Sequence, residues 1–212
     1  MSINRPSNPI PSDQTVRQRL LDRATELFAR KGYASTTVRE IVAAAGVTKP
    51  VLYYYFRNKE GLYLELMKEA WSRFDTILES IPNKAGRVRE KIIRLFDLVF
   101  CLVLEQLEVA RVAYSIYYGP PQGAPFFDFD AFHLKFHKVI NTLVEEGIRT
   151  AELRPGDAME MTWAVIGTCN LAIELEICHP EMGVGREGLT RILNLIFDGI
   201  ASQEGEQKGE RG

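Results

Sequence analysis

The sequence has few cysteines. Only Cys101, Cys169 and Cys178 occur among 212 residues, and they are far apart in the chain. An odd number of scattered cysteines argues against a disulfide framework and against a zinc site. It favours the reducing environment of the cytoplasm.

Membrane and secretion signals are also missing. No uninterrupted apolar run is long enough to span a bilayer, because Arg94 and Asp97 interrupt the most apolar stretch, residues 92–103. Residues 1–11 are polar and proline-rich without an apolar core, so they predict a loose arm and not a secretory signal. No membrane partner is expected.

The sequence shows no arrangement typical of an enzyme. There is no nucleophile beside a base, no phosphate-binding loop and no cluster of metal ligands. His133 and His137 have the four-residue spacing of a metal-binding pair on a helix, but no third ligand is evident nearby. We therefore expect no catalytic residue, no metal and no cofactor.

The charge is distributed unevenly along the chain. Residues 1–70 contain 11 Lys and Arg against 7 Asp and Glu, a net charge of +4, whereas residues 71–212 carry −6. A basic front suits a chain whose first part meets a polyanion. Chance explains so modest an excess equally well.

Helical periodicity dominates the sequence, and no convincing strand alternation occurs. Leu20, Leu21, Ala24, Leu27 and Phe28 recur at helical spacing, with Asp13 as an N-cap and Gly32 as a left-handed stop. The longer predicted helices cover residues 14–31, 59–79, 85–105, 107–118, 127–152, 157–177 and 187–201.

Two short helices are predicted between residues 37 and 59. Thr37 with Glu40 forms a capping box that opens the first at Val38. Gly46 permits a sharp turn, and Thr48 is expected to cap the second helix. Leu52 and Phe56 lie one turn apart and would hold that helix against its neighbours.

This pair of helices has the chemistry of a DNA probe. A major groove admits one helix, and the side chains near its N-terminus read the bases. Lys49, Pro50, Tyr53 and Tyr54 occupy those positions. Hydroxyls at Thr37 and Thr48 suit phosphates, and Lys59 is placed for the flanking DNA backbone.

A plainer interpretation is that residues 53–56 form only hydrophobic core. Three adjacent tyrosines cannot all point inward on a helix, so at least one ring should be exposed. A second alternative is that these are ordinary capped helices without a DNA role.

The motifs in this segment resemble the TetR family of bacterial transcriptional regulators. The resemblance covers about residues 14–62 and rests on Gly32-Tyr33, Thr36–Ile41, Ala44–Lys49, Leu52–Phe56 and Asn58–Leu62. It implies that Thr37 and Thr48 touch phosphates and that Arg39 reads a base. It also implies that Lys49, Pro50 and Tyr53 line the groove, while Tyr54, Tyr55 and Lys59 hold the DNA backbone. Val51 stands where many relatives carry a hydroxyl, so one phosphate contact is absent.

Family members usually enclose a small-molecule pocket among their middle helices. Aromatic residues are dense in that part of this chain and suit an apolar or aromatic effector, although helical bundles bury aromatics routinely. The candidate lining residues are Phe96, Phe100, Tyr114, Tyr117, Tyr118, Phe132, His133, Phe136, His137 and Trp163.

The last two helices resemble the dimerisation pair of that family. One of them contains the small residues Gly167, Thr168, Cys169 and Ala172, which allow close helix approach. The other carries a broad apolar stripe formed by Leu189, Ile192, Leu193, Ile196, Phe197 and Ile200. Burial inside one chain would explain the stripe equally well. However, the two DNA-reading helices of a dimer read DNA far more specifically than one such helix.

The sequence therefore predicts an all-α protein. Its parts are an arm (1–13), a three-helix helix-turn-helix domain (14–58), an effector-binding and dimerisation domain (59–202) and a disordered tail (203–212). We expect a cytoplasmic homodimer that leaves a palindromic operator in double-stranded DNA when a small effector binds. The alternative is an activator or DNA organiser that no ligand controls.

Overall fold

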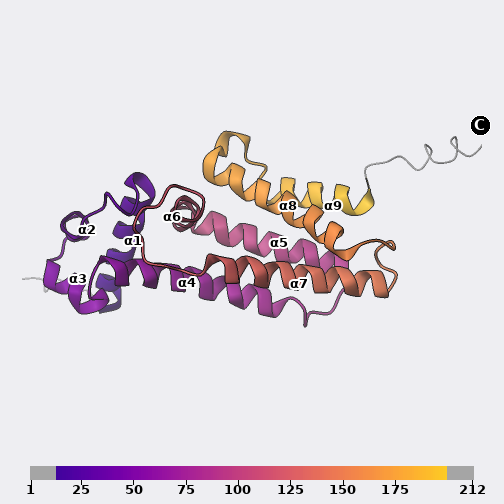
Figure 1. Ribbon diagram of the computed structural model, residues 1–212, viewed down its shortest axis with the longest axis horizontal. Helices are drawn as coiled ribbons and strands as arrows, with labels where there is room; N and C mark the ends of the chain where they lie inside the picture. The colour runs from indigo at the N-terminus through magenta and orange to yellow at the C-terminus, as the bar shows by residue number, and fades with distance from the viewer. Residues whose placement is uncertain (1–12, 200–212) are drawn as a thin grey trace, which may run out of the picture. The chain divides into compact units, whose positions relative to one another are not determined.

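The computed structural model describes residues 13–199 (Figure 1). Residues 1–12 and 200–212 lie outside it, and so do the predicted tail and all of the predicted arm except residue 13. The described part contains nine α-helices and no strand, as predicted, and also one short 3₁₀ helix, Pro180–Met182, which was not predicted. The α-helices are α1 (Asp13–Lys31), α2 (Val38–Ala45), α3 (Lys49–Phe56), α4 (Lys59–Ser80), α5 (Val88–Glu105), α6 (Leu107–Tyr117), α7 (Phe129–Arg149), α8 (Ala158–Cys178) and α9 (Gly185–Asp198).

The chain forms two compact units. Among the described residues, the first contains 13–70 together with 108–127, and the second contains 71–107 together with 128–199. The predicted boundary after residue 58 coincides with the start of α4. By packing, however, the first unit also includes the beginning of α4 and nearly all of α6.

The first unit is organised around the apolar faces of α1, α2, α3 and the start of α4. Leu20, Ile41 and Leu52 are each fully buried, and Phe28 is nearly so. Arg17 on α1 braces this core from outside, because its guanidinium pairs with Glu65 and Glu69 of α4, each at 2.7 Å.

The second unit has its own hydrophobic core between α5, α7, α8 and α9. Most of its helix boundaries fall within three residues of prediction. Helix α5 begins at Val88 and not at residue 85, because Gly86 has a φ of 129° and the Val88 N–H is held by the Glu152 carboxylate at 2.7 Å. Helix α7 begins at Phe129, where Asp128 caps it by accepting from the Ala131 N–H.

The sequence predicted no apolar run long enough to span a bilayer, but helix α8 is more apolar than that prediction implied. By length and composition it could cross a membrane, with a mean hydropathy of 1.3 over its most apolar 18 residues. Only 28% of that window is buried. A single such helix is weak evidence of a membrane span, and it leaves an apolar surface to be explained.

Candidate nucleic-acid interface

Helix α2 is fixed at both ends by the residues that the sequence indicated. The Thr37 N–H donates to the Glu40 carboxylate at 2.9 Å, and the Glu40 N–H donates to the Thr37 hydroxyl at 3.3 Å, which is the predicted capping box. Gly46 ends the helix with a φ of 64°, a conformation that costs glycine little. The turn delivers the chain directly into α3.

Helix α3 has one buried face and one exposed face. Leu52 is fully buried and Phe56 nearly so, whereas Tyr54 is 76% exposed and Tyr53 is 47% exposed. This confirms the prediction that at least one of the three adjacent tyrosine rings is exposed. Tyr55 is half-buried, with its ring 5.0 Å from that of Tyr54.

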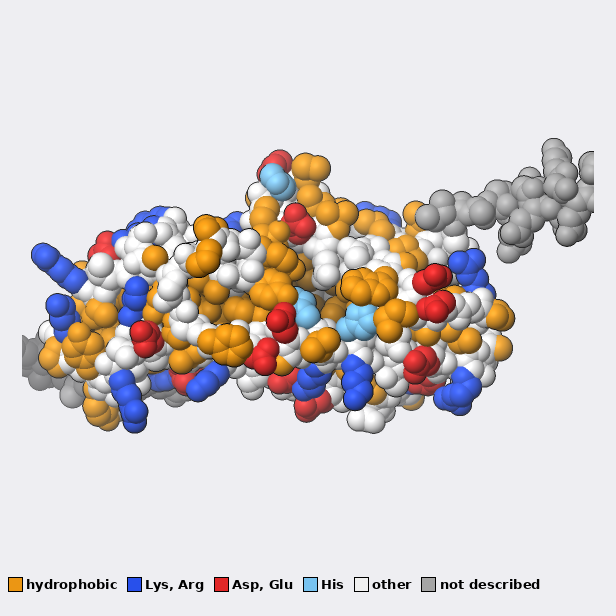
Figure 2. Space-filling model, in the orientation of Figure 1, with side chains coloured by type: hydrophobic (Ala, Val, Ile, Leu, Met, Phe, Trp, Pro, Cys, Tyr) orange, Lys and Arg blue, Asp and Glu red, His pale blue; other side chains and the backbone are white. Residues whose placement is uncertain are grey.

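The polar side chains predicted for the groove are available at the surface. Lys49 and Pro50 are exposed in the first turn of α3, and Arg39 is exposed on α2. Thr48 occupies the N-cap position, but its side chain makes no capping hydrogen bond, contrary to expectation. In Figure 2, Lys and Arg side chains lie over this three-helix region among hydrophobic ones.

Thr37 and Glu40 form a small polar cluster with Lys31. The Thr37 hydroxyl donates to the Glu40 carboxylate at 2.7 Å, and Lys31 pairs with that carboxylate. The Lys31 hydrogen bond, followed by the bonds from Thr37, lowers the pKa of Glu40 to about 2. The hydroxyl proton of Thr37 is therefore already engaged, so Thr37 would meet a phosphate only by exchanging this partner.

Lys59 has an internal role that the sequence did not indicate. Its ammonium donates to the backbone oxygens of Tyr33 at 2.9 Å and Thr36 at 3.0 Å, and it lies 4.0 Å from the centre of the Tyr33 ring. Burial lowers the pKa of Lys59. Lys59 thus ties the start of α4 to the turn before α2. This turn positions the reading surface, by which we mean the exposed side chains of α2 and α3.

Gln122 makes a second tie to the same turn. Its side-chain oxygen accepts from the Tyr33 N–H at 2.9 Å, and its amide donates to the Ser115 oxygen of α6 at 3.2 Å. A Cβ atom at Gly32 would lie 2.7 Å from that oxygen, so glycine is needed there for space as well as for its φ of 83°. No local pattern signals this contact, because 89 residues separate its two partners.

The residues predicted to line an effector pocket are divided between the two units. Tyr114, Tyr117 and Tyr118 belong to the first unit. The others belong to the second unit, where Phe96, Phe100 and Phe136 are buried in the core and Trp163 is exposed. Among the described residues, the buried Nε2 of His137 has no hydrogen-bond partner. The centroid of its ring lies 5.2 Å from the centroid of the Trp163 ring. The Nδ1 of His133 lies 2.9 Å from the Phe129 oxygen.

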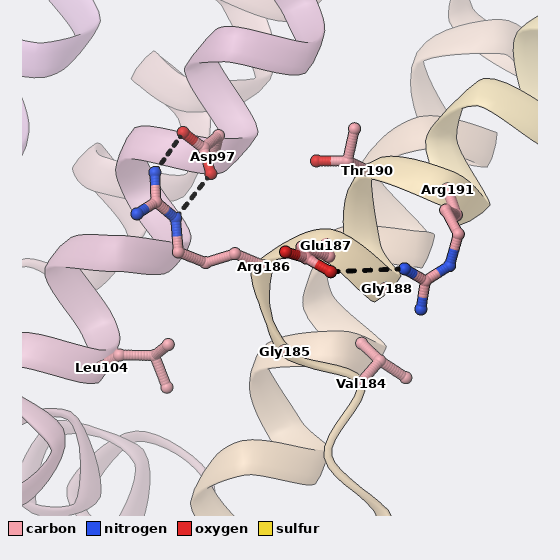
Figure 3. A pocket seen from close by; sticks show the side chains of 9 residues that line it. All are labelled: Asp97, Leu104, Val184, Gly185, Arg186, Glu187, Gly188, Thr190 and Arg191. Carbon is pink, nitrogen blue, oxygen red and sulfur yellow. Dashed lines mark hydrogen bonds and ion pairs between the residues drawn. The ribbon is translucent and has the colours of Figure 1, made fainter.

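A cavity of about 880 Å³ lies between α5 and the start of α9 (Figure 3). Arg186 reaches across it from α9 to Asp97 with two contacts of 2.8 Å, and this guanidinium lowers the pKa of Asp97. Arg191 pairs with Glu187 on the other side. Four of its nine lining residues are charged, and none of the predicted aromatic residues contributes to it. No group of three potential metal ligands occurs among the described residues.

The apolar stripe predicted on the last helix contains both buried and exposed residues. Leu189 and Leu193 are buried in the core of the second unit, together with Cys169 and Ala172 of α8. Ile196 and Phe197 are partly buried against the same core, and Ile192 is exposed. Leu195, which was not part of the predicted stripe, is also exposed on α9, and Trp163 and Leu171 on α8 are 62% and 57% exposed. Ile200 lies outside the described residues. Burial inside one chain therefore explains most of the stripe, and the dimer interface stays a prediction.

These features define a helix-turn-helix protein whose α3 exposes Lys49, Tyr53 and Tyr54. A family model described as "Bacterial regulatory proteins, tetR family" matches residues 20–66. The transcriptional repressor KstR2 of Rhodococcus jostii is 42% identical over 92% of this chain and 98% of its own length.

Solved structures share the fold. The TetR family regulator PfmR from Thermus thermophilus is 22% identical, with a TM-score of 0.71 over 87% of this chain and 100% of that one. The regulator FadR from Bacillus subtilis, solved with stearoyl-CoA, is 20% identical, with a TM-score of 0.66 over 87% and 99%. The chain belongs to the TetR family: it is a DNA-binding transcriptional regulator and not an enzyme.

Proposed function

We propose that the protein is a homodimeric repressor that leaves a palindromic operator when a small apolar or aromatic effector binds. The observation that carries the proposal is the two-faced α3, which buries Leu52 and Phe56 and presents Lys49, Tyr53 and Tyr54 outward. The relative KstR2 is named as a repressor, which favours repression over activation.

The proposed DNA contacts divide into base reading and backbone positioning. Lys49, Pro50 and Tyr53 would face the groove, and Arg39 would read a base from α2. The proposed contacts to the DNA backbone come from Thr37, Thr48, Tyr54, Tyr55 and Lys59. Because Lys59 already serves two carbonyl oxygens, its main contribution is to hold the turn before α2 in place.

The proposed dimer uses the exposed apolar side chains of α8 and α9. Trp163, Leu171 and Leu195 are large and uncovered in the single chain, and removing such surfaces from water stabilises association. A second copy also supplies the second reading head that a palindromic site requires. A bacterial regulator of this kind would act in the cytoplasm, where its operator is.

The effector is proposed to contact the partly exposed pocket candidates of the second unit, Phe132, His133 and His137. The unpartnered Nε2 of His137 would satisfy its hydrogen-bonding capacity with a polar atom of the ligand. The stearoyl-CoA bound to FadR supports a ligand with a long apolar part. The effector must favour the non-binding arrangement of the heads, typically by ~1–3 kcal/mol.

A gel-shift titration tests the proposal. The probe is the DNA upstream of the protein's own gene, and stearoyl-CoA, stearate and several aromatic acids are added in turn. Release by one of these ligands is the expected result. A stable complex that ignores every ligand favours the activator or organiser, and the absence of any shift contradicts DNA binding at this site.

A further inference from the structure

The junction between α3 and α4 contains a strained backbone turn. Arg57 has a φ of 65° and a ψ of −42°, and the Asn58 N–H donates to the Phe56 oxygen at 2.8 Å. A hydrogen bond from residue i+2 to residue i around such a residue defines a γ-turn of the rare type with positive φ. Side chains other than that of glycine are seldom found in this conformation.

The neighbouring residues hold the turn in place. The Asn58 side chain accepts from the Gly61 N–H at 2.7 Å and so caps α4. A Cβ atom at Gly61 would lie 2.1 Å from the Phe56 oxygen, so this glycine is required for the close approach. The turn directs the chain from the reading helix into α4, and it would be easiest to form with glycine at position 57.

The Arg57 side chain has no structural task that would explain its presence. It is exposed, and no ion pair or hydrogen bond of its guanidinium occurs within residues 13–199. Arg17 and Lys31 of the same unit, by contrast, each pair with carboxylates. The charge at position 57 is therefore free for an external anion.

Arg57 comes directly after α3, the helix that exposes Lys49 and Tyr53. Lys49, Tyr53 and Arg57 follow one another at intervals of four residues, and the Arg57 N–H donates to the Tyr53 oxygen at 2.9 Å. This spacing places Lys49 and Tyr53 along one side of α3, and Arg57 follows as the C-cap residue just past the end of the helix. Lys49 is at the end of α3 that would enter the groove, and Arg57 is at the end that would leave it.

We propose that Arg57 is a DNA-phosphate contact at the flank of the operator half-site, and that the strained turn is retained to present its guanidinium there. The inference rests on the proposed DNA-binding function. A guanidinium suits a phosphate because its planar donors match two oxygens at once. Such a contact adds affinity without sequence preference.

The test compares Arg57→Gly, Arg57→Lys and the charge-matched control Lys84→Gly, which lies in an exposed turn of the second unit. Fluorescence anisotropy measures binding to operator and to random DNA at several salt concentrations, and thermal melts report stability. Arg57→Gly should melt at the same or a higher temperature, because glycine relieves the strain. Its affinity for both DNAs should fall about fivefold to thirtyfold, with a salt slope shallower by about 0.9 per head.

Arg57→Lys should keep most of the salt slope, and Lys84→Gly should bind like the wild type. An Arg57→Gly variant with wild-type affinity and slope overturns the assignment. The assignment also fails if that variant melts at a lower temperature, because the turn then does not favour glycine. A wild-type protein that binds no DNA overturns the proposed function as well, which distinguishes the two failures.

Discussion

Helices α3 and α8 both expose large rings, but their surroundings differ. Tyr53 and Tyr54 of α3 lie between Lys49 at the start of the helix and Arg57 directly after its end. Helix α8 contains no lysine or arginine, and Trp163 stands on it among exposed apolar residues. Rings with cations suit a polyanion, whereas rings without them suit another apolar surface. The residues around an exposed aromatic side chain therefore indicate its binding partner better than its exposure alone.

A charge on α8 should have the largest effect. Trp163→Arg would place an unpaired charge in the proposed dimer interface, so the dissociation constant of the dimer should rise by more than about a hundredfold. Met182→Arg, at an equally exposed residue of the 3₁₀ turn, is the control. Sedimentation velocity measures both variants. A Trp163→Arg protein that remains as dimeric as the wild type would remove α8 from the interface.

The two faces of α3 can be separated by a matched pair of truncations. Leu52→Ala opens the core of the first unit and should lower the free energy of unfolding by about 2–5 kcal/mol. Tyr54→Ala, on the exposed face of the same helix, should change it by no more than about 0.5 kcal/mol. Urea denaturation gives both values. Equal losses would mean that Tyr54 also belongs to the core.

Much of the reading surface could be predicted from sequence because its determinants are local. The capping box of Thr37 and Glu40, the left-handed Gly46 and the buried spacing of Leu52 and Phe56 each depend on residues within a few positions. The same local rules identified the helices of the second unit. They could not show which residues of the apolar stripe on α9 are buried and which are exposed, since that depends on which helices pack against α9.

The features that the sequence did not indicate depend on long-range contacts or on strain. Lys59 is predicted as a DNA contact, yet it donates to carbonyl oxygens of the turn at residues 33–36. Gln122 reaches Tyr33 across 89 positions. The γ-turn at Arg57 contradicts the preference of its own residue type, so propensity could not have indicated it.

Gln122 provides a smaller test of how the first unit is held together. Gln122→Ala leaves the Tyr33 N–H without its acceptor, which should cost about 1 kcal/mol and speed exchange of that amide about fivefold. Gln122→Glu keeps an acceptor for Tyr33 and loses only the donor to Ser115, so it should exchange more slowly than the alanine variant. Hydrogen exchange monitored by NMR measures both. Unchanged exchange in Gln122→Ala would contradict the tie.

The smallest expected effect concerns pH. The pKa of Glu40 is lowered to about 2 from its ordinary value of 4.5, so the folded state favours the ionised carboxylate. Its contribution to stability is present above pH 4.5 and is lost as the pH falls toward 2. Glu40→Gln should therefore show a shallower decline in melting temperature between about pH 5 and pH 3. A decline as steep as that of the wild type would show that Glu40 does not contribute.

The contrast between α3 and α8 is tested most directly by one titration of operator DNA. Lys49→Ala is compared with the wild type by fluorescence anisotropy at fixed salt, with sedimentation velocity on the same samples. We expect about a tenfold or larger loss of affinity in a protein that remains a dimer, because the variant lacks a groove contact worth about 1–3 kcal/mol. Wild-type affinity in Lys49→Ala would contradict the claim that α3 reads DNA.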